Sequence, residues 1–404
     1  MRVLIADKFS AEGKATLASM GLHIEDRPEL TAQQLPDALE RAQADVLIVR
    51  STKVTAEAFD QGARLGLVIR AGAGVNTIDL AAASQHGVFV ANTPGKNAIA
   101  VAELTMGLML ALDRNIPDAV AELRQGHWDK KRFGKARGLC GRRLGLVGFG
   151  SIAREVAIRA QAFGMAVHAF DVVLTDEIAH THDVARAPTL GELLRDSDIV
   201  SIHVPYIAGR THHLIGEAEL ALMKDGACLI HTARGGVVDD AALIAEITSG
   251  RLRAALDVFE GEPGSGRADW HSALLQATGA YGTPHIGAST DQAADAIAQE
   301  VVRIVDGYLN QGLVHNCVNV QRTRGEGFTV VIRHLDQVGV LAAVLDAFQQ
   351  EQLNVQQMHN VIFDGNAAAS ATISLAHEPS AELIARLSGR DDVLAVSVRS
   401  AAPR

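Results

Sequence analysis

The chain has 404 residues and a mass of 42.7 kDa, enough for two or three domains at roughly 100–200 residues each. Hydrophobic residues make up 48% of it and charged residues 21%, ordinary values that exclude a disordered or collagen-like protein. The formal net charge of -10 argues against a general nucleic-acid binder and against a protein that binds an anionic membrane.

The cysteines, Cys140, Cys228 and Cys317, lie far apart and show neither CxxC pairing nor zinc-ligand spacing. We therefore expect no disulfide framework and no metal site, as is typical of a reducing, cytoplasmic location. Residues 1–13 lack the long apolar core of a signal peptide, and no run reaches the roughly 18 apolar residues of a membrane span.

In the first third, short apolar runs at residues 2–6, 46–49, 67–69 and 88–90 alternate with helical segments such as 31–43 and 56–64. This alternation predicts a parallel sheet covered by helices on both faces. A long helix is predicted over residues 98–112. It carries almost no charge beyond Glu103, so we expect it to be buried within the protein or against a second subunit.

The alternation restarts with apolar runs at residues 144–147, 166–170, 199–204, 227–232 and 253–258, which predict a second doubly wound unit. A helix is expected over residues 291–309. Residues 319–327 are polar and contain two glycines, as a linker does.

The last part of the chain changes character. Strands are predicted at residues 328–333, 354–363, 368–375 and 393–398, and helices at 338–350 and 382–387. Asp364-Gly365 is a hairpin turn signal between the middle strands. The order βαββαβ predicts a ferredoxin-like module appended to an enzyme-sized unit.

A glycine-rich turn predicts the dinucleotide site. Gly148, Gly150 and Ala153 satisfy G-x-G-x-x-G/A between a strand and a helix, the context in which this pattern binds a pyrophosphate. Asp171 ends the next strand, where an acid accepts hydrogen bonds from ribose and repels a 2′-phosphate. The sequence therefore predicts NAD rather than NADP.

Three further segments, residues 231–236, 256–263 and 283–289, follow strands of the second unit and supply Arg234, a choice of Glu260 or Glu262, and His285. Because ligands bind at the carboxyl ends of strands in open α/β sheets, these groups are expected to meet. The set suits oxidation of a 2-hydroxy acid: the histidine takes the hydroxyl proton, the acid supports it, and the arginine holds the carboxylate.

The motifs LIVRSTKVT, RAGAGVNTIDL, ANTPGKN, LVGFGSIA, TARGGVVD, LDVFEGEP and TPHIGAST lie between residues 46 and 289. In combination they resemble the D-2-hydroxyacid dehydrogenase family, and within it the members that oxidise 3-phospho-D-glycerate at the start of L-serine synthesis. The resemblance implies that Arg234, Glu262 and His285 are catalytic, because the family's acid directly precedes the proline.

The resemblance also implies contacts to NAD, with Asp257 facing the nicotinamide carboxamide. Beyond the glycines, the implied cofactor residues are Ala73, Ser151, Ile152, Asp171, Val204, Pro205, Thr232, Ala233, Asp257 and the loop 285–288, including Gly287 and Ala288. The family's fold implies a discontinuous substrate domain of residues 1–96 and 287–318, an NAD-binding Rossmann domain of residues 97–286, a linker at 319–327 and a module at 328–404.

An anion site is expected in the first unit. Arg50 and Arg70 end strands beside Ser51 and the loop of Gly72 and Gly74, whose amides can bind a carboxylate while the arginines face a phosphate. By resemblance, Lys130 reaches the phosphate in a neighbouring subunit's site, in a homodimer or homotetramer; the alternative is a solvated basic loop. The family usually has Asp-Asn at Asn76-Thr77 and asparagine at His231.

The C-terminal module resembles an ACT domain. That likeness implies an effector serine contacted by His334 and Asn354, with Asp336 in place of the usual asparagine; the alternative is a dimerisation module that binds nothing. For the whole chain, the alternatives to phosphoglycerate oxidation are a hydroxypyruvate or glyoxylate reductase of the same family and a non-catalytic protein that senses NAD(H).

Overall fold

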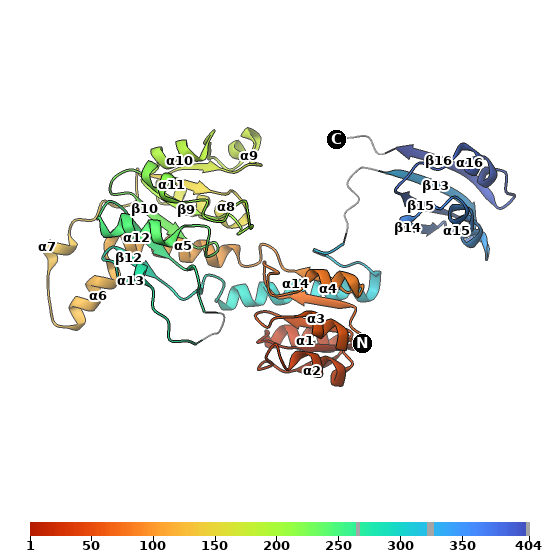
Figure 1. The fold of residues 1–404 in the computed structure, drawn as a ribbon, viewed down its shortest axis with the longest axis horizontal. Helices are drawn as coiled ribbons and strands as arrows, with labels where there is room; N and C mark the ends of the chain where they lie inside the picture. The colour runs from red at the N-terminus through yellow and green to blue at the C-terminus, as the bar shows by residue number, and fades with distance from the viewer. Residues whose placement is uncertain (264–266, 321–326, 401–404) are drawn as a thin grey trace. The chain divides into compact units, whose positions relative to one another are not determined.

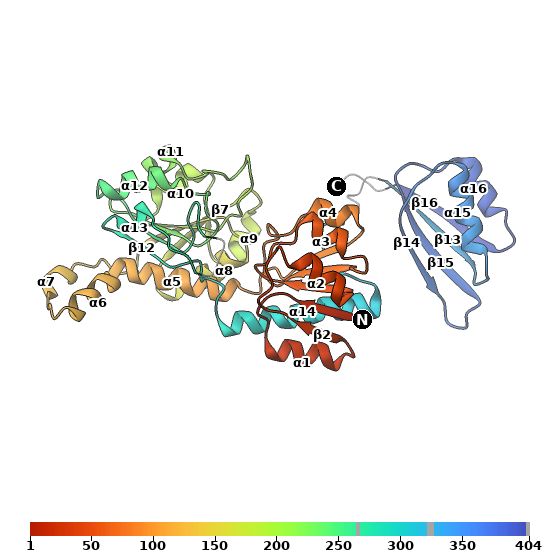
Figure 2. The same cartoon turned by 60° about the horizontal axis from the view of Figure 1, so that its bottom comes forward.

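The computed structural model describes residues 1–263, 267–320 and 327–400, and it divides into two units, Met1–Asn319 and Val320–Arg404. Each unit has a hydrophobic core of its own. The division falls at the predicted linker, residues 319–327, most of which lies outside the described residues. Figures 1 and 2 show the elements of each unit.

The first sheet is parallel and has five strands in the order β2-β1-β3-β4-β5. Its strands are β1 (Arg2–Ile5), β2 (His23–Asp26), β3 (Val46–Val49), β4 (Leu67–Arg70) and β5 (Phe89–Asn92). Its flanking helices are α1 (Ala11–Ser19), α2 (Leu35–Ala42), α3 (Ala56–Gln61), α4 (Leu80–Gln85) and α14 (Asp291–Gln311). All four residues of β3 are buried because helices cover both faces of this sheet.

Helix α14 comes from the far end of the unit's sequence. Thr290 caps its first turn by accepting a hydrogen bond from the Ala293 amide. Its apolar face, including Val301 and Ile304, then packs against β1 and β3 on the side that also holds α1. The late helix thus completes the layer begun by the first strands.

In this region the structure adds one strand and shortens one helix relative to the sequence prediction. Strand β2 was not predicted, because its sequence HIED has only one strongly apolar residue and it pairs with β1 alone at the sheet edge. Helix α2 begins at Leu35 rather than at residue 31, since Pro36 sits in its first turn and residues 32–34 form a turn.

The second sheet is also parallel and has seven strands in the order β12-β11-β10-β9-β6-β7-β8. Its strands are β6 (Arg143–Val147), β7 (Ala166–Phe170), β8 (Ala185–Arg186), β9 (Ile199–Ile202), β10 (Cys228–His231), β11 (Arg253–Leu256) and β12 (Ala280–Gly282). Its helices are α8 (Ser151–Ala162), α9 (Asp176–Thr181), α10 (Leu190–Asp196), α11 (Glu217–Leu222), α12 (Asp240–Thr248) and α13 (Ala273–Gln276). The predicted pair of Rossmann-like parallel sheets is confirmed.

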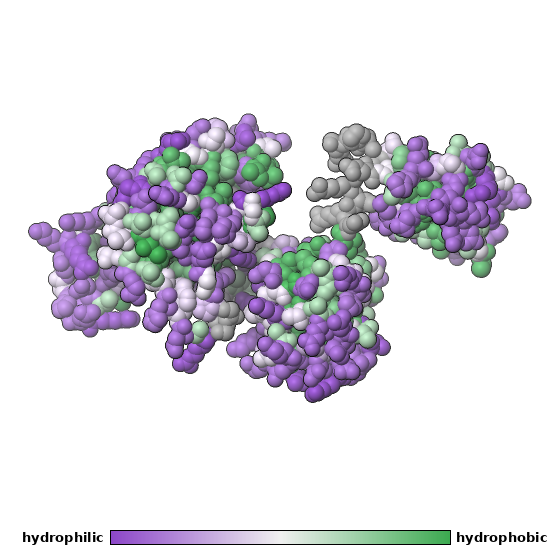
Figure 3. All heavy atoms as spheres, viewed as in Figure 1, coloured by the Kyte–Doolittle hydropathy of each residue, from purple (hydrophilic) through white to green (hydrophobic). Residues whose placement is uncertain are grey.

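Helix α5 (Ala98–Arg114) lies along the second sheet and packs against α8, and most of its inward-facing residues are buried, as predicted. Asn115 adopts a left-handed conformation, with a φ of 51°, and turns the chain into α6 (Ile116–Arg124). The short α7 (Lys130–Phe133) follows at the end away from the first sheet (Figures 1 and 2). In the view of Figure 3 this arm is largely hydrophilic.

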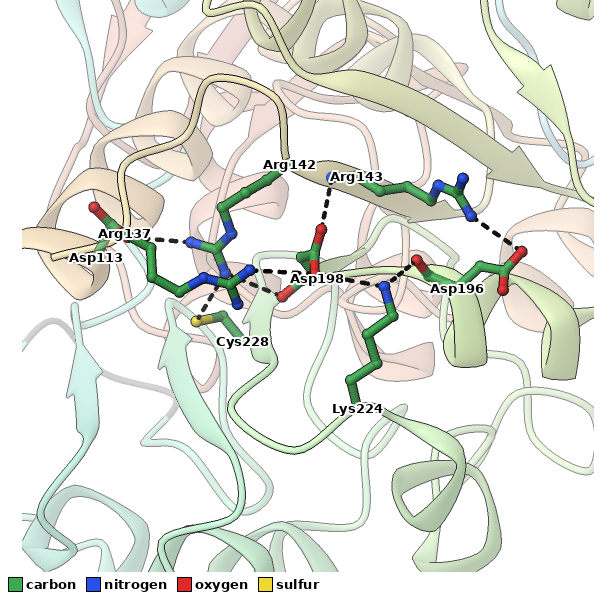
Figure 4. Close-up of polar contacts among 8 residues, drawn as sticks. All are labelled: Asp113, Arg137, Arg142, Arg143, Asp196, Asp198, Lys224 and Cys228. Atoms are coloured by element: carbon green, nitrogen blue, oxygen red, sulfur yellow. Dashed lines mark hydrogen bonds and ion pairs between the residues drawn. The ribbon is translucent and has the colours of Figure 1, made fainter.

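A buried ion pair fastens α5 to the amino ends of the second sheet's strands (Figure 4). The Arg142 guanidinium lies 3.1 Å from the Asp113 carboxylate, and both side chains are almost fully buried. Arg142 also donates to the carbonyl oxygen of Asp198 at 3.2 Å, and Asp113 accepts from the Gly138 amide at 3.0 Å. The pair therefore joins a helix, a strand start and the loop before β6.

The C-terminal unit has the order β13 (Phe328–Leu335), α15 (Val340–Gln350), β14 (Val355–Ile362), β15 (Ala368–Leu375), α16 (Ala381–Ser388) and β16 (Val393–Ser400). This is the predicted βαββαβ order. The sheet is antiparallel with strand order β14-β15-β13-β16, and the helices bury one of its faces. The match to an ACT domain in particular stays a prediction.

None of the described helices is long and apolar enough to cross a membrane. All three cysteines, each in the described part of the chain, are unpaired.

Candidate active site

A cleft of about 1060 Å³ lies in the first unit, between the carboxyl ends of both parallel sheets. The first sheet contributes the loop after β4, and the second contributes the loops after β6, β9, β10 and β11. Its lining residues include Ala73, Gly74, Asn76, Ile152, Val204, Pro205, Ala233, Arg234 and Glu262. Many of the predicted site residues are therefore brought to one cleft.

His285 and Glu262 form a hydrogen-bonded pair beside this cleft. The distance from His285 Nδ1 to Glu262 Oε1 is 2.5 Å, and the Phe259 amide donates to the other oxygen of Glu262 at 3.2 Å. Burial acts to raise the pKa of Glu262, but the hydrogen bond and charge of His285, with Arg234 nearby, hold it below its usual value. Glu262 is thus an ionised acceptor, which leaves His285 Nε2 as the nitrogen available to a substrate.

The alternative acid, Glu260, points to other partners. Its Oε1 lies 3.2 Å from His213 Nε2, and its amide donates to Asp240. The structure therefore pairs Glu262, and not Glu260, with His285.

Arg234 faces the glycine loop of the first sheet. A Cβ added to Gly74 would lie 3.4 Å from Arg234 Nη2, so the guanidinium crosses the cleft toward the loop after β4. Gly235 permits this position, because a Cβ there would collide with the Phe259 carbonyl oxygen of the neighbouring loop. The loops after β10 and β11 therefore touch, which brings Arg234 near Glu262.

His231 lies beneath the Arg234 loop. Its Nε2–H donates to the carbonyl oxygen of Arg234 at 2.9 Å, and the ring is 1% exposed. Burial lowers the pKa of His231 to about 4, and burial together with the charge of His231 lowers that of His203 to about 3. Both rings are neutral at physiological pH, and His231 supports the arginine loop from inside the protein.

The glycine-rich turn fits a dinucleotide. Gly148 has a φ of 88°, and a Cβ there would lie 2.8 Å from the His203 carbonyl oxygen, so the protein itself requires this glycine. A Cβ at Gly150 would meet no atom within 4 Å. Gly150 opens α8 without a side-chain cap, so the space above it leaves the first amides of the helix accessible, as binding of an anion requires.

Asp171 lies beside that turn at the end of β7. Its carboxylate accepts from the Phe149 amide at 2.8 Å and from the Val173 amide at 3.0 Å. These bonds hold the glycine turn against β7 and leave further lone pairs for a ribose.

Asp257 differs from its expected surroundings. It is 1% exposed and accepts hydrogen bonds from the Thr283 hydroxyl, the Ile286 amide and the Gly287 amide at 2.6–2.8 Å. Asp257 therefore anchors the loop that holds His285, which has a φ of 51°. Its predicted contact with the nicotinamide stays a prediction.

Arg50 and Arg70 lie side by side at the carboxyl ends of β3 and β4. Arg70 Nε donates to the Arg50 carbonyl oxygen at 3.0 Å, and Arg50 Nη2 lies 3.5 Å from the carbonyl oxygen of Ala288. Burial, then Arg234 and Arg50, lower the pKa of Arg70 to about 10. Arg70 thus lies near both Arg50 and Arg234, and of the three only Arg234 lines the cleft; the group concentrates positive charge, which suits an anion.

Sequence reasoning missed Asp7, which follows β1 and accepts hydrogen bonds from the amides of Arg50, Ser51 and Thr52. The available signal was an acid just after a strand, as at Asp171. These bonds also engage the Ser51 amide, so a substrate would have to meet Ser51 through another group, such as its hydroxyl.

Lys130 and the predicted effector residues are not among the described residues that line this cleft. Lys130 is exposed on α7, so its predicted role in a neighbouring subunit stays a prediction. In the C-terminal unit His334 is 2% exposed, and its ring nitrogens face the Leu335 carbonyl oxygen at 2.7 Å and Asn360 at 3.2 Å. Asp336 and Asn354 are exposed; the effector role of all three stays a prediction.

Among the described residues, one group of histidine and acidic side chains, His212, His213 and Glu260, has ligand atoms within 4.8 Å of one another. The two imidazole rings are stacked with centroids 3.9 Å apart and an interplanar angle of 21°. Their in-plane lone pairs therefore do not converge on one ion.

Comparison with known proteins agrees with this geometry. The family model described as "D-isomer specific 2-hydroxyacid dehydrogenase, NAD binding domain" matches residues 106–287. The hydroxypyruvate reductase of Thermotoga maritima is 41% identical over 306 residues, which cover 74% of this chain and 96% of the relative. The chain belongs to the D-isomer specific 2-hydroxyacid dehydrogenase family. The predicted family, its NAD-binding domain and its class of oxidoreductase are confirmed.

Other relatives of this family differ in length and name. The D-3-phosphoglycerate dehydrogenase of Methanocaldococcus jannaschii is 39% identical over 321 residues, and the match spans 78% of this chain but 59% of that relative. A crystal structure of a glyoxylate reductase from Paecilomyes thermophila superimposes with a TM-score of 0.70 at 27% identity, covering 80% of this chain and 99% of that one.

Proposed function

We propose that this D-2-hydroxyacid dehydrogenase oxidises 3-phospho-D-glycerate to 3-phosphohydroxypyruvate with NAD. The observation that carries the proposal is the gathering of Arg50, Arg70 and Arg234 near the His285–Glu262 pair. A singly charged 2-hydroxy acid needs one guanidinium group, for its carboxylate. A phosphorylated acid carries further negative charge, which two additional guanidinium groups can neutralise.

His285 acts as the base in this reaction. Its Nδ1–H donates to Glu262, which fixes the tautomer and leaves the Nε2 lone pair to take the proton of the C2 hydroxyl. Glu262 stays ionised and stabilises the imidazolium that forms. The bound NAD would supply the hydride acceptor, so that the C2–H bond would break with its electron pair as the C2=O bond forms.

Arg234 would hold the substrate carboxylate, assisted by backbone amides of the loop after Gly72, whose own amide donates to the Arg70 carbonyl oxygen at 2.8 Å. Arg50 and Arg70 would then face the phosphate from the ends of their strands. With this division, the reacting carbon would lie between the carboxylate at Arg234 and the base His285, and the phosphate would lie toward Arg50 and Arg70.

A second candidate is reduction of hydroxypyruvate or glyoxylate. The Thermotoga maritima relative, which carries that name, matches over almost its whole length, so the observation that favours this reading is the comparison itself. This reaction uses the same pair and Arg234 in the reverse direction and does not require Arg50 and Arg70 together.

The deciding experiment is a substrate panel. We expect NADH formation from 3-phosphoglycerate with a kcat/KM at least about tenfold above that for unphosphorylated 2-hydroxy acids, a difference of about 1.4 kcal/mol in transition-state binding. NADP should support less activity because Asp171 would meet its 2′-phosphate. Equal or lower efficiency with the phosphorylated acid would contradict the proposal and favour the reductase.

The remaining predictions accompany this proposal. A homodimer or homotetramer with Lys130 reaching a neighbouring site, a serine effect through the C-terminal unit, and a cytoplasmic location stay predictions. Light scattering, and initial rates with millimolar serine, test the first two directly.

A further inference from the structure

We propose that Asp7 is a positioning residue that holds the Arg50–Arg70 anion site in shape through the turn after β3. The inference rests on the proposed function, since it names the residue that organises the proposed phosphate contacts. The Oδ2 atom of Asp7 accepts three backbone amides of this turn, so Asp7 acts through the segment that carries Arg50.

Three backbone hydrogen bonds converge on the carboxylate of Asp7. One oxygen, Oδ2, accepts the Arg50 amide at 2.7 Å and the Ser51 and Thr52 amides at 3.0 Å each. Three successive amides that converge on one carboxylate oxygen fix the backbone of the turn. Without this acceptor, the partly buried amides of Arg50 and Thr52 would have to find other partners.

The location matters because of the strand order. In the order β2-β1-β3-β4-β5 the chain reverses direction across the sheet between β1 and β3, and open α/β sheets bind ligands in the crevice at such a point. Asp7 follows β1 and Arg50 follows β3, so the three hydrogen bonds to this carboxylate join the carboxyl ends of two adjacent strands.

The arginines depend on that turn. The Arg50 carbonyl oxygen, in the middle of the fixed segment, accepts the Arg70 Nε–H at 3.0 Å. The side chain of Arg50 extends the other way, to within 3.5 Å of the Ala288 carbonyl oxygen just beyond the His285 loop. A shift of this turn would therefore move both guanidinium groups.

The charge of Asp7 and its hydrogen bonds predict opposite effects on anion binding when Asp7 is removed. As a charge, Asp7 opposes the anion that the site binds, so its removal alone would strengthen anion binding. As an acceptor, it organises the donors, so its removal would weaken binding. Asp7→Asn keeps an oxygen for the three amides and loses the charge, whereas Asp7→Ala loses both.

The test is steady-state kinetics on the full chain with 3-phosphoglycerate and with the unphosphorylated 2-hydroxy acid that the wild type oxidises best. We expect Asp7→Ala to raise the KM for 3-phosphoglycerate by about tenfold or more, with kcat changed by about threefold at most. Asp7→Asn should restore a KM close to that of the wild type. The KM for the unphosphorylated acid should change less in both variants.

Asp45 offers a matched control at the opposite end of the same sheet. Its Oδ2 accepts the Arg2 amide at 2.7 Å and its Oδ1 pairs with Arg64 at 2.7 Å. Asp45→Ala removes comparable bonds and should leave both KM values unchanged. If Asp7→Ala does not fold, Asp7→Glu displaces the acceptor while keeping the charge, and it carries the same expectation of a raised KM.

The outcomes separate the two proposals. If the wild type prefers phosphorylated substrate but Asp7→Ala keeps its KM, only the positioning role of Asp7 is overturned. Asp7→Asn as impaired as Asp7→Ala would also overturn it. If the wild type shows no preference, the proposed function fails. The positioning role is then judged by the KM for the best substrate, which Asp7→Ala must raise and Asp7→Asn must restore.

Discussion

At the scale of single residues, the surroundings of each histidine decide its chemistry. His285 shares a short hydrogen bond with an ionised acid and has a free nitrogen beside the cleft. His231 and His203 are enclosed and neutral. The same side chain therefore serves as a proposed base in one position and as an uncharged support in the others.

The Glu262–His285 pair leads to a prediction for activity. Glu262→Gln keeps a hydrogen-bonding group but loses the charge that stabilises the imidazolium, so kcat/KM should fall by about 100-fold or more. Glu260 lies two residues away and pairs with His213, so Glu260→Gln should lower kcat/KM by about tenfold at most. Comparable losses in the two variants would contradict the assignment of Glu262.

His231 leads to a prediction for stability against pH. Its folded-state pKa, about 4, lies below its ordinary value of 6.5, so the unfolded chain takes up the proton first as the pH falls. The stabilisation is therefore present above pH 6.5 and is lost as the pH falls toward 4. Thermal melting should show a shallower loss over this window for His231→Asn. If the melting temperature of His231→Asn falls with pH as steeply as that of the wild type, His231 does not contribute to the pH dependence of stability.

At the scale of elements, the carboxyl ends of the strands gather the functional groups, and the amino ends hold the framework. The Arg142–Asp113 pair ties α5 to the second sheet (Figure 4). Because the pair is buried, the loss of one partner leaves an uncompensated charge inside the protein.

Asp113→Ala should therefore lower the free energy of unfolding by about 3 kcal/mol. The Arg143–Asp196 pair in the same figure is largely exposed, at 39% and 62%, and provides the control. Asp196→Ala should cost about 0.5 kcal/mol. Urea denaturation measures both, and a small effect for Asp113→Ala would mean that α5 is held by apolar packing alone.

At the scale of the whole molecule, the two units have separate cores. The cleft is built entirely from residues of the first unit. A chain that ends after Asn319 should therefore retain kcat/KM to within about threefold of the full chain at saturating NAD. Loss of turnover in a folded truncated protein would show that the C-terminal unit takes part in hydride transfer, for instance through the oligomer.

Much of the architecture and the site could be predicted from the sequence. Gly148 and Asp171 stand at fixed positions relative to a strand and a helix, so their pattern is local and can be recognised in the chain. The apolar runs of β3 and β10 likewise specify strands that are buried on both faces. Arg234, Glu262 and His285 were selected as a set through family motifs.

Other features depend on residues that are distant in the chain. No local pattern shows that Asp7 meets the amides after β3, because that contact depends on the order of strands in the sheet. The approach of Arg234 to Gly74 needs both sheets in place, and the contact of His334 with Asn360 joins β13 to β14, which is two strands away in its sheet. Local patterns therefore specified elements, the nucleotide turn and the family, while only long-range packing decided which charges converge, because electrostatic and hydrogen-bonding partners are set by distance in space.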